Sequence, residues 1–364
     1  MNQNMNRNLH REESPLPSFT GVTKAVWDFG ELVLRNRTAR ALERGTTLFP
    51  VYRELRFAAR VEMQVLFDAI ALDPAWRAER LNADTLLLLA DGLYVAGFAT
   101  RKADYTSCLF YIYAASIARA EEAKERLLAK AGAARITEPM FTVDWYFGGM
   151  MGGTDVASVE EIANDVLRDG AYPEIRGGVH DFVRRYLDAP ETVLVLQGPP
   201  GTGKTRLIRG ILGEMSRRKG EQARALYTGD ARALSTDEIF VRFITGTHDA
   251  FVVEDADHLL KPRADGNENL HRFLTIADGV VRAQGRKVIF STNLPNVGDL
   301  DDALVRPGRC FAHTHVRKLT GAEAKALAQE LAGEDAEKLT RAALAFAAEE
   351  EKKRSVAEVY AALR

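Results

Sequence analysis

The sequence predicts an α/β protein in which a parallel, five-stranded sheet with a C-terminal helical lid follows a small α+β N-terminal domain. Three observations lead to this prediction. From residue 156 onward, short apolar runs alternate with helical patterns, as in a doubly wound sheet. A glycine-rich loop at 198–205 stands between an apolar run and a helical pattern. Further upstream, Asp91-Gly92 separates two apolar runs, as the turn of a β-hairpin does.

Length and composition are those of a globular protein with two domains. The chain has 364 residues, of which 46% are hydrophobic and 27% charged, and its formal net charge is −2. The near-neutral balance provides no general basic surface for nucleic acid. Two cysteines far apart in sequence, Cys108 and Cys310, fit a reducing compartment better than a metal or redox pair.

No segment suggests export or a membrane span. The first residues lack the apolar stretch of a signal peptide, and the longest apolar stretch, 85–97, is short and is interrupted by Asp91. We therefore expect a cytoplasmic protein with no membrane partner.

The N-terminal part divides into a polar leader and a small domain. We expect residues 1–20 to form a flexible leader broken by Pro15 and Pro17, and residues 21–147 to form an α+β domain that binds a partner or substrate. Helical spacing predominates over 22–81, and the hairpin follows. A strand at 108–113, a helix at 118–130 and a strand at 136–147 complete this domain. The glycine-rich stretch 148–155 is then expected to be a linker.

A run of arginines lies on the helix expected around residues 39–60. Its members are Arg40, Arg44, Arg53, Arg56 and Arg60, with few acids between them. Such a run could meet phosphates or an acidic partner. A solvated helix face is the simpler interpretation.

The larger domain is predicted at 156–318. It starts with a helix at 159–167 and continues through a loop at Tyr172-Pro173 and a helix at 180–187. Strands are expected at 193–196, 223–227, 250–254, 287–291 and 310–316. Beyond residue 319 the chain is rich in Ala, Leu, Glu and Lys at helical spacing, which predicts the lid at 319–364.

The glycine loop is suited to binding phosphate. Glycines allow successive backbone N–H groups to curl around phosphate oxygens, and the following helix N-terminus adds a partial positive charge. Lys204 would reach the β- and γ-phosphates, and Thr205 would place its hydroxyl on Mg²⁺. The residues expected to bind nucleotide are Gly198, Pro199, Pro200, Gly201, Thr202, Gly203, Lys204, Thr205 and Arg206.

A second apolar strand ends in the acids Glu254 and Asp255. Nucleotide hydrolysis needs one carboxylate for the water shell of Mg²⁺ and another to orient or deprotonate the attacking water. Adjacent acids at the end of a buried strand supply both.

With these features, the chain from about residue 156 onward resembles the AAA+ ATPases, which bind ATP and Mg²⁺. The stretch 287–293 resembles the family's sensor strand, and the resemblance implies that Asn293 contacts the γ-phosphate or the attacking water. The stretch 301–309 is similar to the family's second region of homology, which implies that Arg306 and Arg309 are arginine fingers for a neighbouring subunit. A homo-oligomeric ring, hexameric or heptameric, is thereby implied.

Within this family, the order Glu254-Asp255, where most relatives have Asp-Glu, resembles the branch of the mitochondrial Rieske-protein translocase. The stretch Leu234-Ser235-Thr236-Asp237 before a helix at 238–244 supports the same likeness. It implies that Glu254 lies on the magnesium side and that Asp255 activates water. Because Asp is shorter than Glu, we hypothesise slower hydrolysis or a tighter pocket.

Two further features bear on the substrate. Tyr172, with Pro173 and Ile175, occupies the place where family members pack adenine, although a plain loop-packing role is equally open. No aromatic-apolar-glycine pore loop occurs between Tyr227 and Phe251, which disfavours threading of an extended polypeptide.

Three functions remain open at this point. The first is a ring-forming ATPase that remodels or translocates an unknown protein partner through its N-terminal domain. The second is a nucleic-acid-associated ATPase of phage or replication type, which the near-neutral charge disfavours. The third is an ATP-gated scaffold in signalling or defence.

Overall fold

The structure, a computed structural model, describes residues 36, 49–81, 83–102, 104–149, 153–261, 270–278, 285–296, 300–346 and 352–364. The chain forms two compact units, Met1–Thr137 and Glu138–Arg364. The leader expected at 1–20 and the arginines Arg40 and Arg44 lie outside the described residues. Among the described helices, none has the length and apolarity to cross a bilayer.

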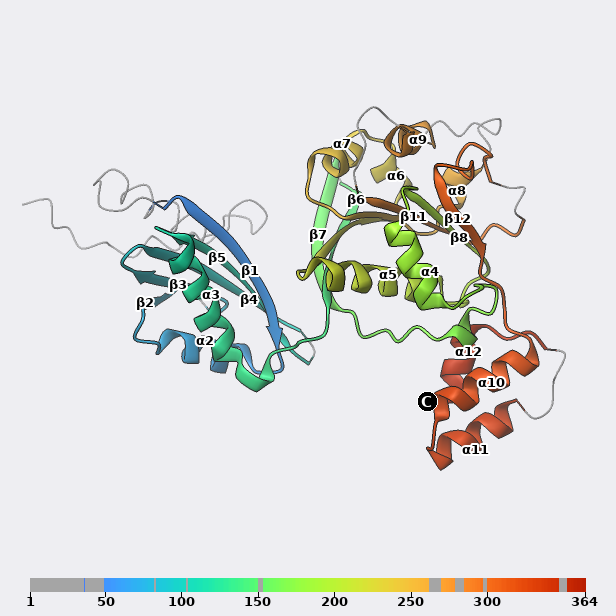
Figure 1. The fold of residues 1–364 in the computed structure, drawn as a ribbon, viewed down its shortest axis with the longest axis horizontal. Coiled ribbons are helices and arrows are strands. Elements are labelled where there is room, and N and C mark those ends of the chain that lie inside the picture. The colour runs from blue at the N-terminus through green and yellow to red at the C-terminus, as the bar shows by residue number, and fades with distance from the viewer. Residues whose placement is uncertain are drawn as a thin grey trace, which may run out of the picture. The chain divides into compact units, whose positions relative to one another are not determined.

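The first unit is a five-stranded antiparallel sheet with helices on one face (Figure 1). Its elements are β1 (Val51–Ala59), α2 (Met63–Ala71), β2 (Arg77–Arg80), β3 (Thr85–Ala90), β4 (Leu93–Arg101), β5 (Thr106–Ala114), α3 (Ile117–Ala131) and a short 3₁₀ turn, η1 (Gly132–Ala134). The strands follow the order β1-β5-β4-β3-β2. The predicted hairpin is confirmed, because Ala90 pairs with Leu93 around Asp91-Gly92 and Gly92 has φ +64°.

Burial of apolar side chains between the helices and the sheet forms the core of this unit. Leu66, Phe67 and Ile70 of α2 and Leu127 of α3 pack against buried residues of β1, β3, β4 and β5. The helix α3 begins where Ser116 accepts a hydrogen bond from the N–H of Arg119, as an N-cap residue does.

The prediction of a helix around residues 39–60 is wrong for its last part, because residues 51–59 form strand β1. Leu55, Phe57 and Ala59 alternate toward the core, which is the period of a strand. Arg56 forms an ion pair of 2.6 Å with Glu54 on the same face of the strand. The described arginines of the run therefore do not share a helix face.

The second unit is built on a mixed seven-stranded sheet in the order β12-β8-β11-β10-β9-β6-β7. All neighbouring pairs are parallel except β6 and β7. Its strands are β6 (Met140–Gly148), β7 (Thr154–Ile162), β8 (Val193–Gln197), β9 (Ala223–Thr228), β10 (Ala250–Val253), β11 (Lys287–Thr292) and β12 (Cys310–His315). The five parallel strands predicted from sequence are β9, β10, β11, β8 and β12.

The two additional strands correct the predicted organisation at residues 136–167. The described ends of the glycine-rich stretch expected to be a linker instead belong to the paired strands β6 and β7, since Gly148 pairs with Thr154. The helix expected at 159–167 is absent: residues 159–162 belong to the edge strand β7, and residues 163–167 are neither helix nor strand. Strand β6, which we assigned to the N-terminal domain, pairs with β9, so the boundary between the units lies at Thr137 and Glu138 rather than near residue 148.

The buried carboxylate of Asp144 joins β6 to its neighbouring strands by hydrogen bonds. Asp144, 2% exposed, accepts hydrogen bonds from Ser158 of β7 at 2.5 Å and from Arg224 of β9 at 2.7 Å. His248, just before β10, lies 2.8 Å from the same carboxylate. Burial acts to raise the pKa of Asp144, but the hydrogen bonds from His248 and Ser158 outweigh it, so that the pKa lies well below its usual range.

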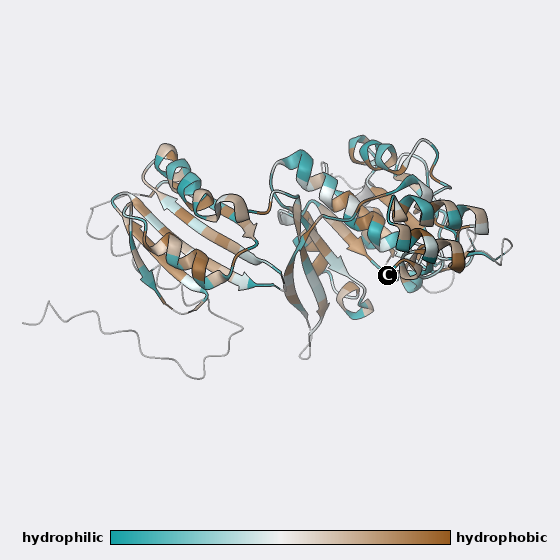
Figure 2. Cartoon of the chain, turned by 90° about the horizontal axis from the view of Figure 1, so that it is seen from below, coloured by the Kyte–Doolittle hydropathy of each residue, from teal (hydrophilic) through white to brown (hydrophobic). Residues whose placement is uncertain are grey.

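Helices cover both faces of this sheet. One face carries α4 (Val179–Asp188) and α5 (Lys204–Lys219), and the other carries α6 (Ala231–Leu234), α7 (Glu238–Thr245), α8 (Asp257–Leu260) and α9 (Leu270–Asp278). Figure 2 shows hydrophobic residues along the strands and more hydrophilic ones on the outer sides of the helices. This arrangement leaves the ends of the strands as the places where polar side chains gather.

The chain ends in three helices, α10 (Gly321–Ala332), α11 (Ala336–Ala345) and α12 (Val356–Ala362). Capping boxes start two of them. Thr320 pairs reciprocally with Glu323 at the start of α10, and Ser355 pairs with Glu358 at the start of α12. These caps fix where α10 and α12 begin.

Candidate functional site

A cavity of about 640 Å³ opens at the carboxyl ends of the central parallel strands. Its lining combines the glycine loop after β8, the acids after β10, the end of β11 and one side of α12. Ligands of open parallel sheets bind in such a crevice. The residues singled out from three separate stretches of sequence thus meet in one place.

The glycine loop needs its glycines for steric reasons. Gly203 has φ +98°, a conformation that residues with a Cβ rarely adopt. At Gly198, an added Cβ would lie 1.9 Å from the carbonyl oxygen of Val316. The loop is braced further by Thr202, whose hydroxyl donates to the carbonyl of Pro199 at 2.9 Å. The result is a rigid backbone cradle at the N-terminus of α5, where an anion is favoured.

Lys204 lies in the cradle and is only 8% exposed. Its ammonium donates to the carbonyl of Gly198 at 2.6 Å and to Oδ1 of Asn293 at 2.9 Å. Burial lowers the pKa of Lys204, while the charges of Asp255 and Glu254 act in the opposite direction. Both predicted residues, Lys204 and Asn293, are therefore in direct contact.

Thr205 and Glu254 face one another at the cavity wall. The Thr205 hydroxyl donates to Oε1 of Glu254 at 2.6 Å, and the phenol of Tyr227 donates to Oε2 at 3.0 Å. Hydroxyl and carboxylate oxygens suit Mg²⁺, which usually takes few protein ligands and completes its shell with water and phosphate oxygens. Among the described residues, no group of three or more His, Cys, Asp or Glu side chains could hold a metal ion by itself.

Asp255 is the one described residue other than glycine with a positive φ, +50°. This left-handed turn ends the extended chain after β10 and leaves the side chain exposed in the cavity. Oδ1 of Asp255 accepts a hydrogen bond from Nδ2 of Asn293 at 2.8 Å. Asn293 in turn is held by Asp257, which accepts a hydrogen bond from its backbone N–H at 2.8 Å.

These contacts form a continuous polar chain from Lys204 through Asn293 to Asp255. The positive φ of Asp255 is a strained backbone conformation for a residue other than glycine, and such strain is found mostly at functional sites. Asp257 was not singled out from the sequence, although its position two residues after Asp255 could have suggested a supporting role.

The helix α12 closes one side of the cavity and was not predicted as part of the site. The N–H of Ala357 donates to the carbonyl of Gly201 at 2.9 Å. The guanidinium of Arg206 lies 3.9 Å from the centre of the Tyr360 ring. The helical pattern of the C-terminal segment predicts α12, but nothing in it indicates contact with the glycine loop.

Tyr172 supports the glycine loop from the protein interior. It is 1% exposed, and its phenol donates to the carbonyl of Gly203 at 3.0 Å. It does not belong to the described residues that line the cavity. Its role as an adenine contact stays a prediction.

The two arginines expected to act on a neighbouring subunit have different surroundings. Arg306 is exposed, whereas Arg309 is 9% exposed and its guanidinium donates to the carbonyl of Ala303. Neither appears among the described lining residues of the cavity. Of the two, only Arg306 is available at the surface to another molecule.

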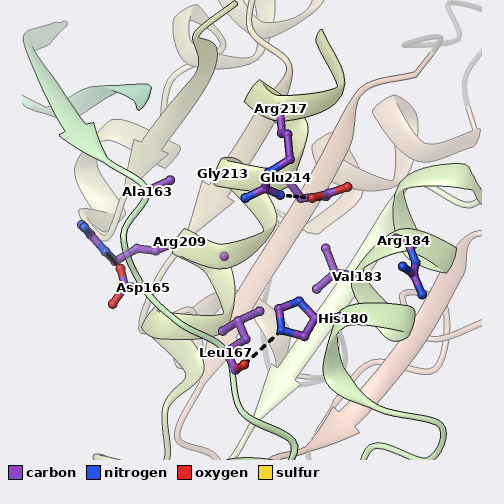
Figure 3. A pocket seen from close by; sticks show the side chains of 11 residues that line it. Ala163, Asp165, Leu167, His180, Val183, Arg184, Arg209, Gly213, Glu214 and Arg217 are labelled. Carbon is purple, nitrogen blue, oxygen red and sulfur yellow. Dashed lines mark hydrogen bonds and ion pairs between the residues drawn. The ribbon is translucent and has the colours of Figure 1, made fainter. Parts of the chain in front are cut away.

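A second, smaller cavity of about 110 Å³ lies under the segment that leads from β7 to η2 (Asp169–Ala171) (Figure 3). This segment crosses α5 closely at Gly210 and Gly213, where an added Cβ would lie 2.5 Å from Leu167 and 2.6 Å from Ala163. The ring of His180 contacts the carbonyl of Leu167 at 3.0 Å. The cavity is too small for a nucleotide.

Residues 194–318 match the model of the ATPase family associated with various cellular activities (AAA). The chain is similar to an AAA-ATPase of Arabidopsis thaliana, 32% identical over 185 residues, which are 47% of this chain and 37% of the plant protein. It is also similar to the peroxisomal ATPase PEX6 of Homo sapiens, 28% identical over 159 residues, 38% of this chain and 16% of the human protein. The ATP-dependent zinc metalloprotease YME1 homolog of Schizosaccharomyces pombe is 32% identical over 179 residues, 45% of this chain and 23% of the yeast protein.

The matched segment holds the glycine loop, the acids after β10 and Asn293, and the mixed α/β sheet to which its strands belong is consistent with an AAA core. The chain spans 37% or less of the length of these relatives.

Proposed function

We propose that this protein binds ATP with Mg²⁺ in the cavity at the end of the parallel strands and hydrolyses it to ADP and phosphate. The observation that carries the proposal is the polar chain from Lys204 through Asn293 to Asp255 in front of the glycine cradle. In this chain of contacts, the side-chain amide of Asn293 bonds the Lys204 ammonium, which would bind phosphate, through its oxygen and the Asp255 carboxylate through its nitrogen. Similarity to the AAA family supports the same reaction.

Each side chain has a definite task in this proposal. The cradle and Lys204 hold the phosphates, and Thr205 with Glu254 would hold the magnesium ion, which when bound neutralises charge on the β- and γ-phosphates. The carboxylate of Asp255 orients the attacking water and accepts its proton. Asn293 holds that carboxylate and shares the γ-phosphate region with Lys204.

Completion of the site by a second copy of the chain is part of the proposal. A transition state for phosphoryl transfer spreads negative charge over the γ-phosphoryl oxygens, and an arginine supplied from a neighbour stabilises it. Because Arg306 is exposed and lies outside the cavity lining, we assign this task to Arg306 in a ring of six or seven subunits. Arg309, turned toward Ala303, would position the loop that carries Arg306.

We further propose that hydrolysis drives the remodelling or translocation of a protein partner through the N-terminal unit. The peroxisomal and metalloprotease relatives are named for ATP-dependent activities, and the near-neutral charge of this chain favours a protein partner over nucleic acid. The likeness to the Rieske-translocase branch rests on Glu254-Asp255 and on the stretch 234–237, and it stays a prediction.

The variant Asp255→Asn tests the hydrolytic part of the proposal. Removing the proton acceptor is expected to lower the ATPase rate at least about 100-fold while ATP binding is retained. In contrast, Lys204→Ala is expected to abolish binding itself. ATP hydrolysis by Asp255→Asn at the parental rate would refute the assignment.

ATPase rates of the parent protein measured with and without DNA separate the two partner classes, since strong stimulation by DNA would favour a nucleic-acid-associated ATPase.

A further inference from the structure

The carboxylate of Glu254 is held at both oxygens by different elements of the site. Oε1 accepts the Thr205 hydroxyl at 2.6 Å, and Oε2 accepts the Tyr227 phenol at 3.0 Å. Thr205 belongs to α5 after the glycine loop, and Tyr227 belongs to β9. One carboxylate therefore joins the loop helix to the neighbouring strand of the sheet.

A glutamate at this position needs such a second contact more than an aspartate does. Its side chain has one more rotatable bond, and each free rotor must be fixed at a cost in conformational entropy before the carboxylate can face a metal in a single orientation. A hydrogen bond to Oε2 fixes that rotor and leaves Oε1 directed to Thr205. The tyrosine thus compensates for the length of Glu254.

Tyr227 is itself rigidly placed. It pairs with Val252 of β10 on one side and with Trp145 of β6 on the other. The Trp145 ring meets the Tyr227 ring edge to face, with 5.9 Å between centroids. The phenol has one O–H donor, and it is directed to Oε2 of Glu254.

We infer that Tyr227 is a positioning residue for the magnesium-side carboxylate: its phenol anchors Oε2 of Glu254 so that Oε1 and the Thr205 hydroxyl present one preformed pair of oxygens to Mg²⁺. This inference rests on the proposed nucleotide site and adds to it a residue outside the glycine loop and the acid pair. It also gives strand β6, through Trp145, a part in supporting the site.

The test measures how Mg²⁺ supports nucleotide binding in Tyr227→Phe, which loses only the hydroxyl. The probe is a non-hydrolysable ATP analogue titrated at a series of Mg²⁺ concentrations. The half-saturating Mg²⁺ concentration is expected to rise about tenfold, as is usual when a residue that orients a metal ligand is lost. Binding of the analogue without Mg²⁺ is expected to stay at the parental level, because Tyr227 acts only through the magnesium-side carboxylate.

A second background makes the test specific. In Glu254→Asp the shorter carboxylate no longer reaches the phenol, so adding Tyr227→Phe is expected to cause no further change in Mg²⁺ dependence. The matched control is Tyr186→Phe, which removes a buried phenol that donates to main-chain carbonyls of Thr192 and Val288 in the same unit. It is expected to lower stability without altering Mg²⁺ dependence.

The inference is overturned if Tyr227→Phe binds the analogue with parental Mg²⁺ dependence, or if its effect is equally large in the Glu254→Asp background. Loss of binding both with and without Mg²⁺ would also overturn it, because that pattern indicates a general structural role. A parent protein that fails to bind the analogue through Lys204 would instead refute the proposed function.

Discussion

At the scale of single residues, Glu174 is an acid whose buried surroundings disfavour its charged form. Both of its carboxylate oxygens are buried and have no hydrogen-bond partner in another described residue. Burial raises the pKa of Glu174 to about 7, while a hydrogen bond from its own backbone and the charge of Arg317 act in the opposite direction. Folding therefore favours the protonated acid at this position.

The pH dependence of stability follows from that shift. The pKa of Glu174 in the folded protein lies above its unfolded value of about 4.3. The stability gained from protonated Glu174 is therefore complete below the unfolded pKa and is lost as the pH rises through the folded pKa of about 7. Glu174→Gln is therefore expected to increase the free energy of unfolding at pH 8 by about 1 kcal/mol, after allowance for solvent screening. The gain should diminish toward pH 5 in denaturant titrations.

The exposed Glu334 provides the control, since Glu334→Gln removes the same charge without burial. An equal gain in both variants, or a gain for Glu174→Gln that does not change between pH 5 and pH 8, would contradict the account.

Residues of the site differ in how far sequence could identify them. The glycine loop and the acids after β10 were predictable because phosphate and metal chemistry restrict both residue type and spacing. Tyr227 and Tyr360 were not, because their roles depend on which strand or helix lies beside the loop in space. Arg309 shows that a motif does not by itself fix what a side chain contacts. The motif implies an arginine finger for a neighbouring subunit, but the guanidinium donates to the carbonyl of Ala303 in its own chain.

At the scale of elements, the sequence predicted the central strands and the helices α3, α4 and α5, whose apolar periodicities are strong. It failed at β7, where Val156, Val159 and Ile162 follow a helical spacing. Residues 155–158 of this edge strand are exposed on both faces, so the alternation that marks a strand is weak there. Pairing with β6 decides the structure instead.

The C-terminal helix α12 is the element that links stability to the candidate site. Its N-cap, Ser355, accepts the N–H of Glu358 at 3.2 Å, and its first turn donates to Gly201 in the glycine loop. Ser355→Ala is expected to lower the free energy of unfolding by about 1 kcal/mol. Because the first turn of α12 would then fray beside the loop, the affinity for ATP should also fall several-fold, measured by equilibrium binding.

Thr320 supplies the matched control, because it forms the same capping box at α10 and is not a described lining residue of the cavity. Thr320→Ala should cost a similar stability and leave ATP affinity unchanged. If both variants, or neither, weakened ATP binding, the proposed role of α12 in the site would be wrong.

At the scale of the whole molecule, the central claim is that a site is completed by a neighbouring copy. Within one chain, the cavity brings together Lys204, Asn293 and Asp255, while Arg306 lies exposed outside its lining. An arginine in that place could stabilise a γ-phosphoryl transition state only if another molecule presents its nucleotide to it. Hydrolysis should then depend on assembly.

Mixing two inactive variants tests this claim most directly. Asp255→Asn lacks the acid but keeps Arg306, and Arg306→Ala keeps the acid but lacks the arginine. Each alone is expected to be inactive. In mixed rings, roughly a quarter of the sites pair an intact acid with an intact neighbouring arginine, so a comparable fraction of parental ATPase activity should return. Mixed assemblies, verified by mass in ATP, that stay inactive would contradict the account.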